Sequence, residues 1–189
     1  LQCIVGVFAM LMPSFLRRKL RVVIPSKMMV LFAVFLYCAI FLGEVRSFYY
    51  NVPHWDTILH TFSGAMLGAL GFSVINFLNR TDRVPMNLSP AFVAFFTLCF
   101  AVFLGVVWEF YEFSADGILH TNMQKFALES GEPLVGRAAL MDTMKDLIVD
   151  TIGAFVMAVI GYISIKYQKG WVEKFQLHRE KKKSRSSES

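Results

Sequence analysis

Residues Ala91–Trp108 read AFVAFFTLCFAVFLGVVW, a stretch without a single charged side chain. As an α-helix rising about 1.5 Å per residue, it is long enough to cross most of the hydrocarbon core of a bilayer. Of the 189 residues in the chain, 56% are hydrophobic and 17% are charged, whereas soluble domains average about 25% charged residues. The composition excludes a disordered chain and predicts an all-α, polytopic membrane protein.

Similar apolar runs recur along the chain and predict a transmembrane helix bundle of about five spans. The runs are Leu1–Met12, Met28–Gly43, Thr57–Leu78, Ala91–Trp108 and Leu147–Ile165. The first run is too short to span by itself, so we expect it to be the end of a truncated first span. We assign residues 1–167 to the bundle, with an outward loop at 113–146 that holds a short helix near Ala138–Lys145. Residues 168–189 form a basic, partly disordered tail.

The positive charges predict the orientation of the bundle. Of the 19 Lys and Arg residues, 15 fall within residues 17–27, 80–83 and 166–185. The exceptions are Arg46, Lys125, Arg137 and Lys145. Because cytoplasmic loops are enriched in Lys and Arg, these three segments and the C-terminus are predicted to be cytoplasmic. The same basic loop and tail are expected to attract anionic lipids of the bilayer; nucleic acid is a poor interpretation of charges placed in this way.

Two other features are interpreted as structural. The cysteines Cys3, Cys38 and Cys99 lie in apolar runs without a CxxC pair, which is typical of small buried side chains and not of a disulfide or thiolate metal site. Gly64 and Gly68 form a GxxxG motif, which lets two helices approach closely in a membrane.

Ionisable residues gather at the predicted outer ends of the spans. Asp56 and His60 are four residues apart and therefore share one helix face. Two further stripes lie on residues 109–116 and 142–150. The complete set at this end is Glu44, His54, Asp56, His60, Glu109, Glu112, Asp116, Asp142, Asp146 and Asp150. A lone acid at mid-membrane costs about 2.5–3.5 kcal/mol, so we expect the stripes to face one another, a water-filled cavity or a cation.

A set of carboxylates and imidazoles favours a divalent metal. Mixed sets suit Zn²⁺, Mn²⁺ or Fe, whereas all-carboxylate sets suit Mg²⁺ or Ca²⁺. A bound metal lowers the pKa of its water ligand and so supplies a nucleophile. The catalytic base is predicted to be Glu112 or Asp116. The predicted metal ligands are Asp56, His60, Glu109, Asp146 and Asp150, for Zn²⁺, Mn²⁺ or Mg²⁺. The alternative interpretation is that these acids are helix caps and solvated span ends.

Two segments carry a resemblance to a known family. The first holds LGE at 42–44, FY at 48–49 and HWDTILHTFSG at 54–64. The second holds WEFYE at 108–112, followed by Asp116 and by aspartates at the spacing DTxxDLxxDT from residue 142. Over about residues 11–162 the chain resembles the YjdF-like family of bacterial inner-membrane proteins. The resemblance implies a multi-pass protein of the inner membrane and no particular reaction. His54 stands where the family pattern has Trp, which argues against His54 as a ligand.

Three functions remain open from the sequence. The first is a metal-dependent hydrolase of a lipid-linked or phosphorylated envelope substrate. The second is a proton- or cation-coupled transporter, and the third is a non-catalytic membrane protein whose acids bind Ca²⁺ or a partner. A carrier favours broken helices and polar residues near the midplane, often in repeats. The sequence shows none of these features, which favours a site that opens to one side of the membrane. A dimer that encloses a transport pathway between its subunits remains an alternative.

Overall fold

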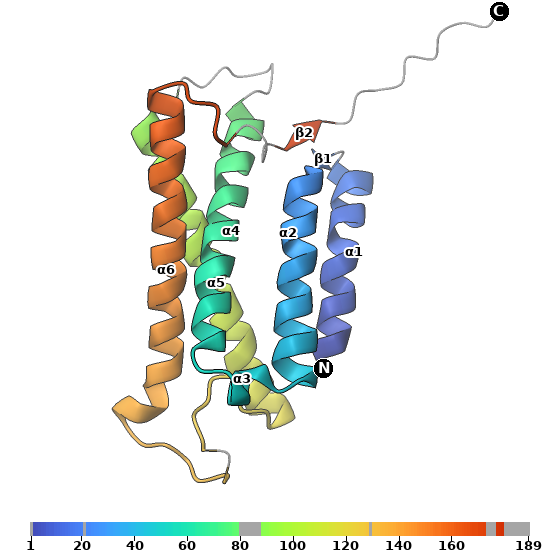
Figure 1. The fold of residues 1–189 in the computed structure, drawn as a ribbon, viewed down its shortest axis with the longest axis vertical. Coiled ribbons are helices and arrows are strands. Elements are labelled where there is room, and N and C mark those ends of the chain that lie inside the picture. Colours follow the sequence, from blue (N-terminus) through green and yellow to red (C-terminus); the bar gives the residue numbers. More distant parts are fainter. Residues whose placement is uncertain (1, 21, 80–87, 129, 173–176, 180–189) are drawn as a thin grey trace, which may run out of the picture.

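The structure is a computed structural model that describes residues 2–20, 22–79, 88–128, 130–172 and 177–179. Its long helices run side by side along the long axis of the molecule (Figure 1). The helices are α1 Gln2–Leu20, α2 Ser26–Leu36, the π-helix η1 Tyr37–Val45, α3 Phe48–Asn51, α4 Trp55–Asn79, α5 Pro90–Leu119 and α6 Arg137–Lys166. The short strands β1 Val22–Val23 and β2 His178–Arg179 pair antiparallel. The predicted all-α fold class is confirmed.

The described residues contain 4 helices that are long and apolar enough to cross a membrane. They are Ser26–Val45, Trp55–Leu78, Pro90–Leu119 and Arg137–Lys166. A shorter apolar helix, Gly6–Phe15, lies within α1, which continues beyond the predicted end at Met12 because strong helix formers follow Pro13.

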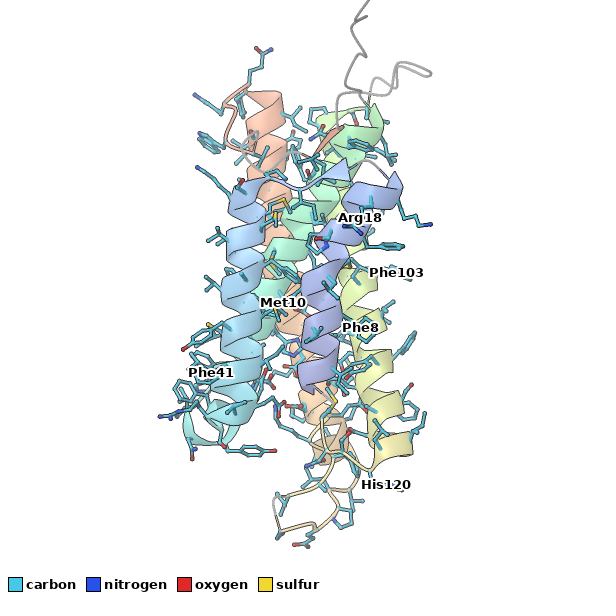
Figure 2. All side chains as sticks on the ribbon, turned by 90° about the vertical axis from the view of Figure 1, so that its right-hand side faces the viewer. Phe8, Met10, Arg18, Phe41, Phe103 and His120 are labelled. Atoms are coloured by element: carbon cyan, nitrogen blue, oxygen red, sulfur yellow. The ribbon has the colours of Figure 1, made fainter. Side chains whose placement is uncertain are left out.

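The bundle has an apolar outer surface and buries several polar side chains in its interior. Large apolar side chains such as Phe8, Phe41 and Phe103 are exposed around its circumference (Figure 2). By contrast, the largest fully buried side chains among the described residues are Thr97, Asp146 and Ser73. A soluble domain shows the opposite distribution, so the arrangement is that of a protein surrounded by lipid.

Helices α5 and α6 are longer than the sequence predicted. The connection between them runs only from His120 to Gly136, so half of the outward loop expected at 113–146 is helical. The short helix expected near Ala138–Lys145 is the first part of α6. Hydropathy ends a span at its first acids, but Asp116 and Asp146 are buried, Asp116 against the α5–α6 connection. An acid that faces the interior does not interrupt a helix.

Helices α4 and α6 touch through glycines. A Cβ atom on Gly64 would collide with the carbonyl oxygen of Asp150, and one on Gly153 would collide with that of Thr61. A Cβ atom on Gly68 would lie 2.9 Å from the Cβ atom of Met157. The GxxxG motif therefore lies in the close helix contact that it predicted.

This contact gives a stability prediction. We expect Gly153→Ala to destabilise the bundle by about 1–3 kcal/mol, because the added methyl group meets backbone atoms that cannot give way. The matched control is Gly117→Ala in α5, where no atom lies within 4 Å of the added Cβ. The control should be neutral or slightly stabilising, since Ala is the better helix former. Thermal unfolding in detergent measures both, and equal effects of the two substitutions would contradict the close contact.

The two ends of the bundle differ in charge. We call them the acidic end, which holds Asp56, Glu112 and Asp142, and the basic end, which holds Lys19, Lys27 and Lys166. At the basic end, Val172 joins an apolar cluster with Phe72, Ile75 and Val93. The backbone N–H of Leu177 donates to Ser73 Oγ at 2.6 Å. Residues that follow α6 therefore fold back over α4 and α5. The predicted basic segment 80–83 and the predicted disordered residues 181–189 lie outside the described residues.

Candidate functional site

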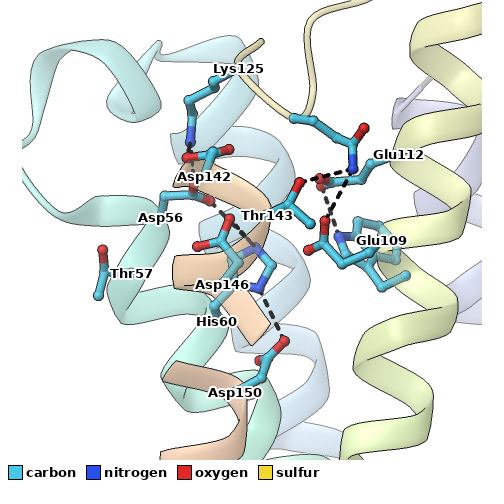
Figure 3. Close-up of polar contacts among 12 residues, drawn as sticks. Asp56, Thr57, His60, Glu109, Glu112, Lys125, Asp142, Thr143, Asp146 and Asp150 are labelled. Atoms are coloured by element: carbon cyan, nitrogen blue, oxygen red, sulfur yellow. Dashed lines mark hydrogen bonds and ion pairs between the residues drawn. The ribbon is translucent and has the colours of Figure 1, made fainter. Parts of the chain in front are cut away.

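His60 lies at the centre of the acidic end, between α4 and α6 (Figure 3). Its Nε2 atom is 3.7 Å from Asp56 Oδ1 and 3.7 Å from Asp146 Oδ2. Its Nδ1 atom is 3.3 Å from Asp150 Oδ2. Asp56 and His60 are one turn apart on α4, as are Asp146 and Asp150 on α6. The glycine contact described above brings these two pairs together.

Three of the predicted metal ligands form a compact group of donor atoms. Asp56, His60 and Asp146 each offer one atom, and these atoms all lie within 4.8 Å of one another. Asp146 is 1% exposed, and its Oδ1 atom is buried without a hydrogen-bond partner. An unpaired oxygen of a buried carboxylate is costly unless a cation or proton satisfies it. Two carboxylates and one imidazole fit a divalent metal such as Zn²⁺ or Mn²⁺.

The structure places Asp150 behind His60, on the opposite ring nitrogen from Asp56 and Asp146. Asp150 Oδ1 accepts a hydrogen bond from Ser63 Oγ at 2.7 Å, which holds the carboxylate in place. Metal-bound histidines usually donate their second ring N–H to such a carboxylate, which fixes the tautomer. With the proton on Nδ1, the lone pair of Nε2 faces the two other carboxylates.

Lys125 closes the site from the α5–α6 connection. Its Nζ atom donates to Asp56 Oδ2 and, at 3.1 Å, to Asp142 Oδ1. Burial lowers the pKa of Lys125, but the charges and hydrogen bonds of Asp56 and Asp142 outweigh burial and raise the pKa above its ordinary value. The sequence predicts no role for Lys125, because no local pattern joins it to partners so distant in the chain.

Asp116 anchors the loop that carries Lys125. Its Oδ1 atom accepts hydrogen bonds from Thr121 Oγ1 at 2.6 Å and from the backbone N–H of Met123 at 2.7 Å. Its Oδ2 atom accepts from the backbone N–H of Gln124 at 3.0 Å. Asp116 is one of the two residues predicted as the catalytic base. In the structure, both of its oxygens accept hydrogen bonds from the loop.

The other predicted acids of α5 face the site from the opposite side (Figure 3). Glu109 Oε2 accepts from Gln124 Nε2 at 3.4 Å, and the same amide donates to Thr143 Oγ1 at 2.9 Å. Glu109 Oε1 is buried without a partner. Glu112 Oε1 accepts from Trp108 Nε1 at 2.9 Å. Glu109 thus lies across from the three-residue donor group and is not part of it.

Two members of the predicted outer set lie away from this centre. Glu44, in η1, and His54, before α4, are both exposed. Tyr49, in α3, is half-buried; burial and then the nearby carboxylates, Asp56 first, raise the pKa of its hydroxyl. The carboxylates of the acidic end thus act on the Tyr49 hydroxyl in the same direction as burial does.

The fold and the site define an integral membrane protein with a buried carboxylate–histidine group at one end of a helix bundle. Residues 1–167 match the family described as predicted membrane protein (DUF2238), and the chain belongs to this family. An uncharacterized protein of Thermotoga maritima is 33% identical over 139 residues, which are 72% of this chain and 62% of that protein. The match thus spans less than two thirds of the relative. No solved structure matches the chain. The predicted membership in a family of membrane proteins is confirmed.

Proposed function

We propose that Asp56, His60 and Asp146 bind one divalent metal ion, and that the site belongs to a membrane hydrolase of a lipid-linked or phosphorylated envelope substrate. The observation that carries this proposal is the meeting of the three donor atoms within 4.8 Å, beside the unpartnered Oδ1 atom of the buried Asp146. Mixed carboxylate and imidazole donors favour Zn²⁺ or Mn²⁺ over Mg²⁺. The metal would supply a water nucleophile at neutral pH.

The chain's own residues account for the rest of the reaction. Asp150 and Ser63 orient the imidazole of His60. Glu109 is the proposed base, because Gln124 holds one of its oxygens while the other is buried without a hydrogen-bond partner. The water oxygen forms the new bond to the reacting centre as the bond to the leaving oxygen breaks. The proton passes from water to Glu109 and from there to the leaving group.

The packing between the two ends supports a hydrolase over a carrier. Beyond Asp150, α4 and α6 are in backbone contact at Gly64 and Gly153. Further along, the apolar cluster around Phe72 and Val172 fills the basic end. A carrier needs its site to open alternately to both sides, and this packing favours a site that opens only at the acidic end.

The charge distribution supports the proposed orientation. We place the acidic end outside the cytoplasm of a bacterial inner membrane, with the C-terminus inside, because the described parts of the Lys- and Arg-rich segments, which include Lys19, Lys27 and Lys166, belong to the other end. Anionic lipids would contact those segments. Reporter fusions after Lys169 test this orientation, and an extracytoplasmic reporter signal there would overturn it.

The metal is the first quantity to measure. We expect the full chain, purified in mild detergent without chelators, to contain about one equivalent of a transition metal by mass spectrometry. Asp56→Asn combined with His60→Ala should remove it, whereas Glu132→Gln, on the exposed part of the loop, should not. Metal-loaded protein is then tested on phosphate esters and acyl esters. A metal-free wild type that also takes up no added Mn²⁺ or Zn²⁺ would overturn the site; bound metal without hydrolysis would overturn the enzyme.

A further inference from the structure

Lys125 is held in the site by a loop whose conformation is fixed by hydrogen bonds. Three hydrogen bonds to Asp116 fix the residues just before it. Lys125 itself has a φ of 47°, in the left-handed region that residues other than glycine rarely adopt. Strained backbone at a polar centre points to a functional demand on the side chain. Here the backbone conformation places the ammonium group of Lys125 between the carboxylates of Asp56 and Asp142.

The ammonium group of Lys125 has donor capacity left over. It carries three N–H donors, of which Asp56 and Asp142 take two. The Lys125 side chain is 36% exposed, whereas those of its two partners are 17% and 15% exposed. Asp56 and Asp142 therefore leave one N–H donor of Lys125 for a further acceptor, and the Lys125 side chain is the most exposed of the three.

The position of Lys125 relative to the proposed metal is set by one carboxylate. Asp56 Oδ2 accepts from Lys125, and Asp56 Oδ1 faces His60 Nε2. The carboxylate of Asp56 would thus lie between the ammonium group and a metal bound by His60, with one oxygen toward each. Two positive charges on either side of one carboxylate suit a ligand with several anionic oxygens.

We infer that Lys125 is the residue that selects a phosphate group at this site, with its free N–H donating to one phosphate oxygen while another oxygen contacts the metal. This inference rests on the proposed function, because without a metal the surrounding carboxylates would repel an anion. Lysine binds phosphate as a compact point charge. A neutral ester would gain little from the ammonium, so the geometry favours phosphorylated over acyl substrates.

A purely structural role for Lys125 makes a different prediction. If Lys125 only neutralises Asp56 and Asp142, its loss changes folding or metal affinity and leaves the affinity of the metal-loaded site for phosphate unchanged. If Lys125 selects phosphate, its loss weakens phosphate binding even when the metal site is saturated. Metal affinity itself should stay equal or rise, because a competing positive charge is gone.

The test uses the full chain in detergent, saturated with Mn²⁺, and inorganic phosphate as the probe. Broadening of the ³¹P resonance by Mn²⁺ reports bound phosphate, and EPR reports Mn²⁺ binding. We expect Lys125→Gln to weaken phosphate binding by about tenfold or more, as for loss of a charged hydrogen bond. Lys125→Arg should recover most of it. The control Arg137→Gln changes an exposed cation at the start of α6 and should leave phosphate binding unchanged.

The outcomes separate the two proposals. A wild type that binds no Mn²⁺ overturns the proposed function and this inference together. Mn²⁺ binding with equal phosphate affinity in wild type and Lys125→Gln overturns this inference alone. Should Lys125→Gln fail to fold, lysine acylation of the Mn²⁺-loaded wild type decides: phosphate protects Lys125 and not Lys169, and absence of that protection overturns the inference. Dihexanoyl phosphatidic acid serves as a second probe; tighter binding than inorganic phosphate assigns the group to a lipid, and weaker binding assigns it to a soluble ester.

Discussion

Asp146→Asn is expected to abolish metal binding and, in the same protein, to raise the thermal stability of the metal-free form. Asp146 is 1% exposed, and its Oδ1 atom has no hydrogen-bond partner. An ionised carboxylate in such a place costs several kcal/mol when no cation satisfies it. Asparagine has nearly the same shape without the charge. Its loss as a ligand should weaken metal binding by about 100-fold or more, since both the charge and a donor atom disappear.

The expected gain in stability has a size that can be measured. A change of about 1–2 kcal/mol moves the unfolding midpoint of a chain of this length by a few degrees. Unfolding in detergent is followed with a chelator and again with added Mn²⁺. The wild type should gain stability from Mn²⁺ by ligand linkage, and Asp146→Asn should not. Wild-type metal affinity in Asp146→Asn would remove Asp146 from the ligand set.

A matched control lies in the same end of the bundle. Asp116 is also a buried aspartate, at 7% exposure, but three donors satisfy its oxygens. Asp116→Asn should therefore lower stability, because asparagine cannot accept all three hydrogen bonds equally well. Metal binding should persist. Opposite signs for the same substitution at two buried aspartates would show that the unpaired oxygen, and not burial alone, sets the effect.

The spans could be predicted because a membrane helix is recognised in the sequence as a long run of uncharged, apolar residues. The ends of the helices could not, because Asp116 and Asp142 look like loop residues by hydropathy although both are helical. The π-helical stretch of η1 was missed for a related reason. Every position in Tyr37–Gly43 is apolar or small, so no periodic pattern distinguishes one helix type from another.

The site could be predicted as pairs and not as a whole. The spacing of Asp56 with His60, and of Asp146 with Asp150, sets each pair on one face of its helix. Which carboxylate meets which ring nitrogen depends on how far α6 is shifted along α4. That shift is set by backbone contact at Gly64 and Gly153, a property of two helices together. The position of Lys125 depends in addition on its own left-handed backbone conformation in a loop. No residue propensity predicts that conformation for lysine.

Asp150→Asn should give a graded loss of metal affinity where Asp146→Asn gives a complete one. Asp150 contacts the Nδ1 atom of His60, at 3.3 Å, on the side away from the other two carboxylates. It therefore orients the imidazole and makes it a better donor without supplying a ligand atom itself. Loss of such a supporting carboxylate typically weakens metal affinity by about 10–100-fold and leaves one metal per site. Ser63→Ala, which frees Asp150 Oδ1, should shift affinity in the same direction by less.

The measurement is a Mn²⁺ titration followed by EPR on wild type, Asp150→Asn and Ser63→Ala. Thr151→Val is the control, because Thr151 Oγ1 donates only within α6, to the carbonyl of Leu147 at 2.7 Å. Its Mn²⁺ affinity should equal that of wild type. Complete loss of the metal in Asp150→Asn would make Asp150 a direct ligand, as the sequence alone predicted, and would require His60 to bind through Nδ1. A graded loss instead assigns Nε2 as the metal-binding nitrogen, because only that atom faces both Asp56 and Asp146.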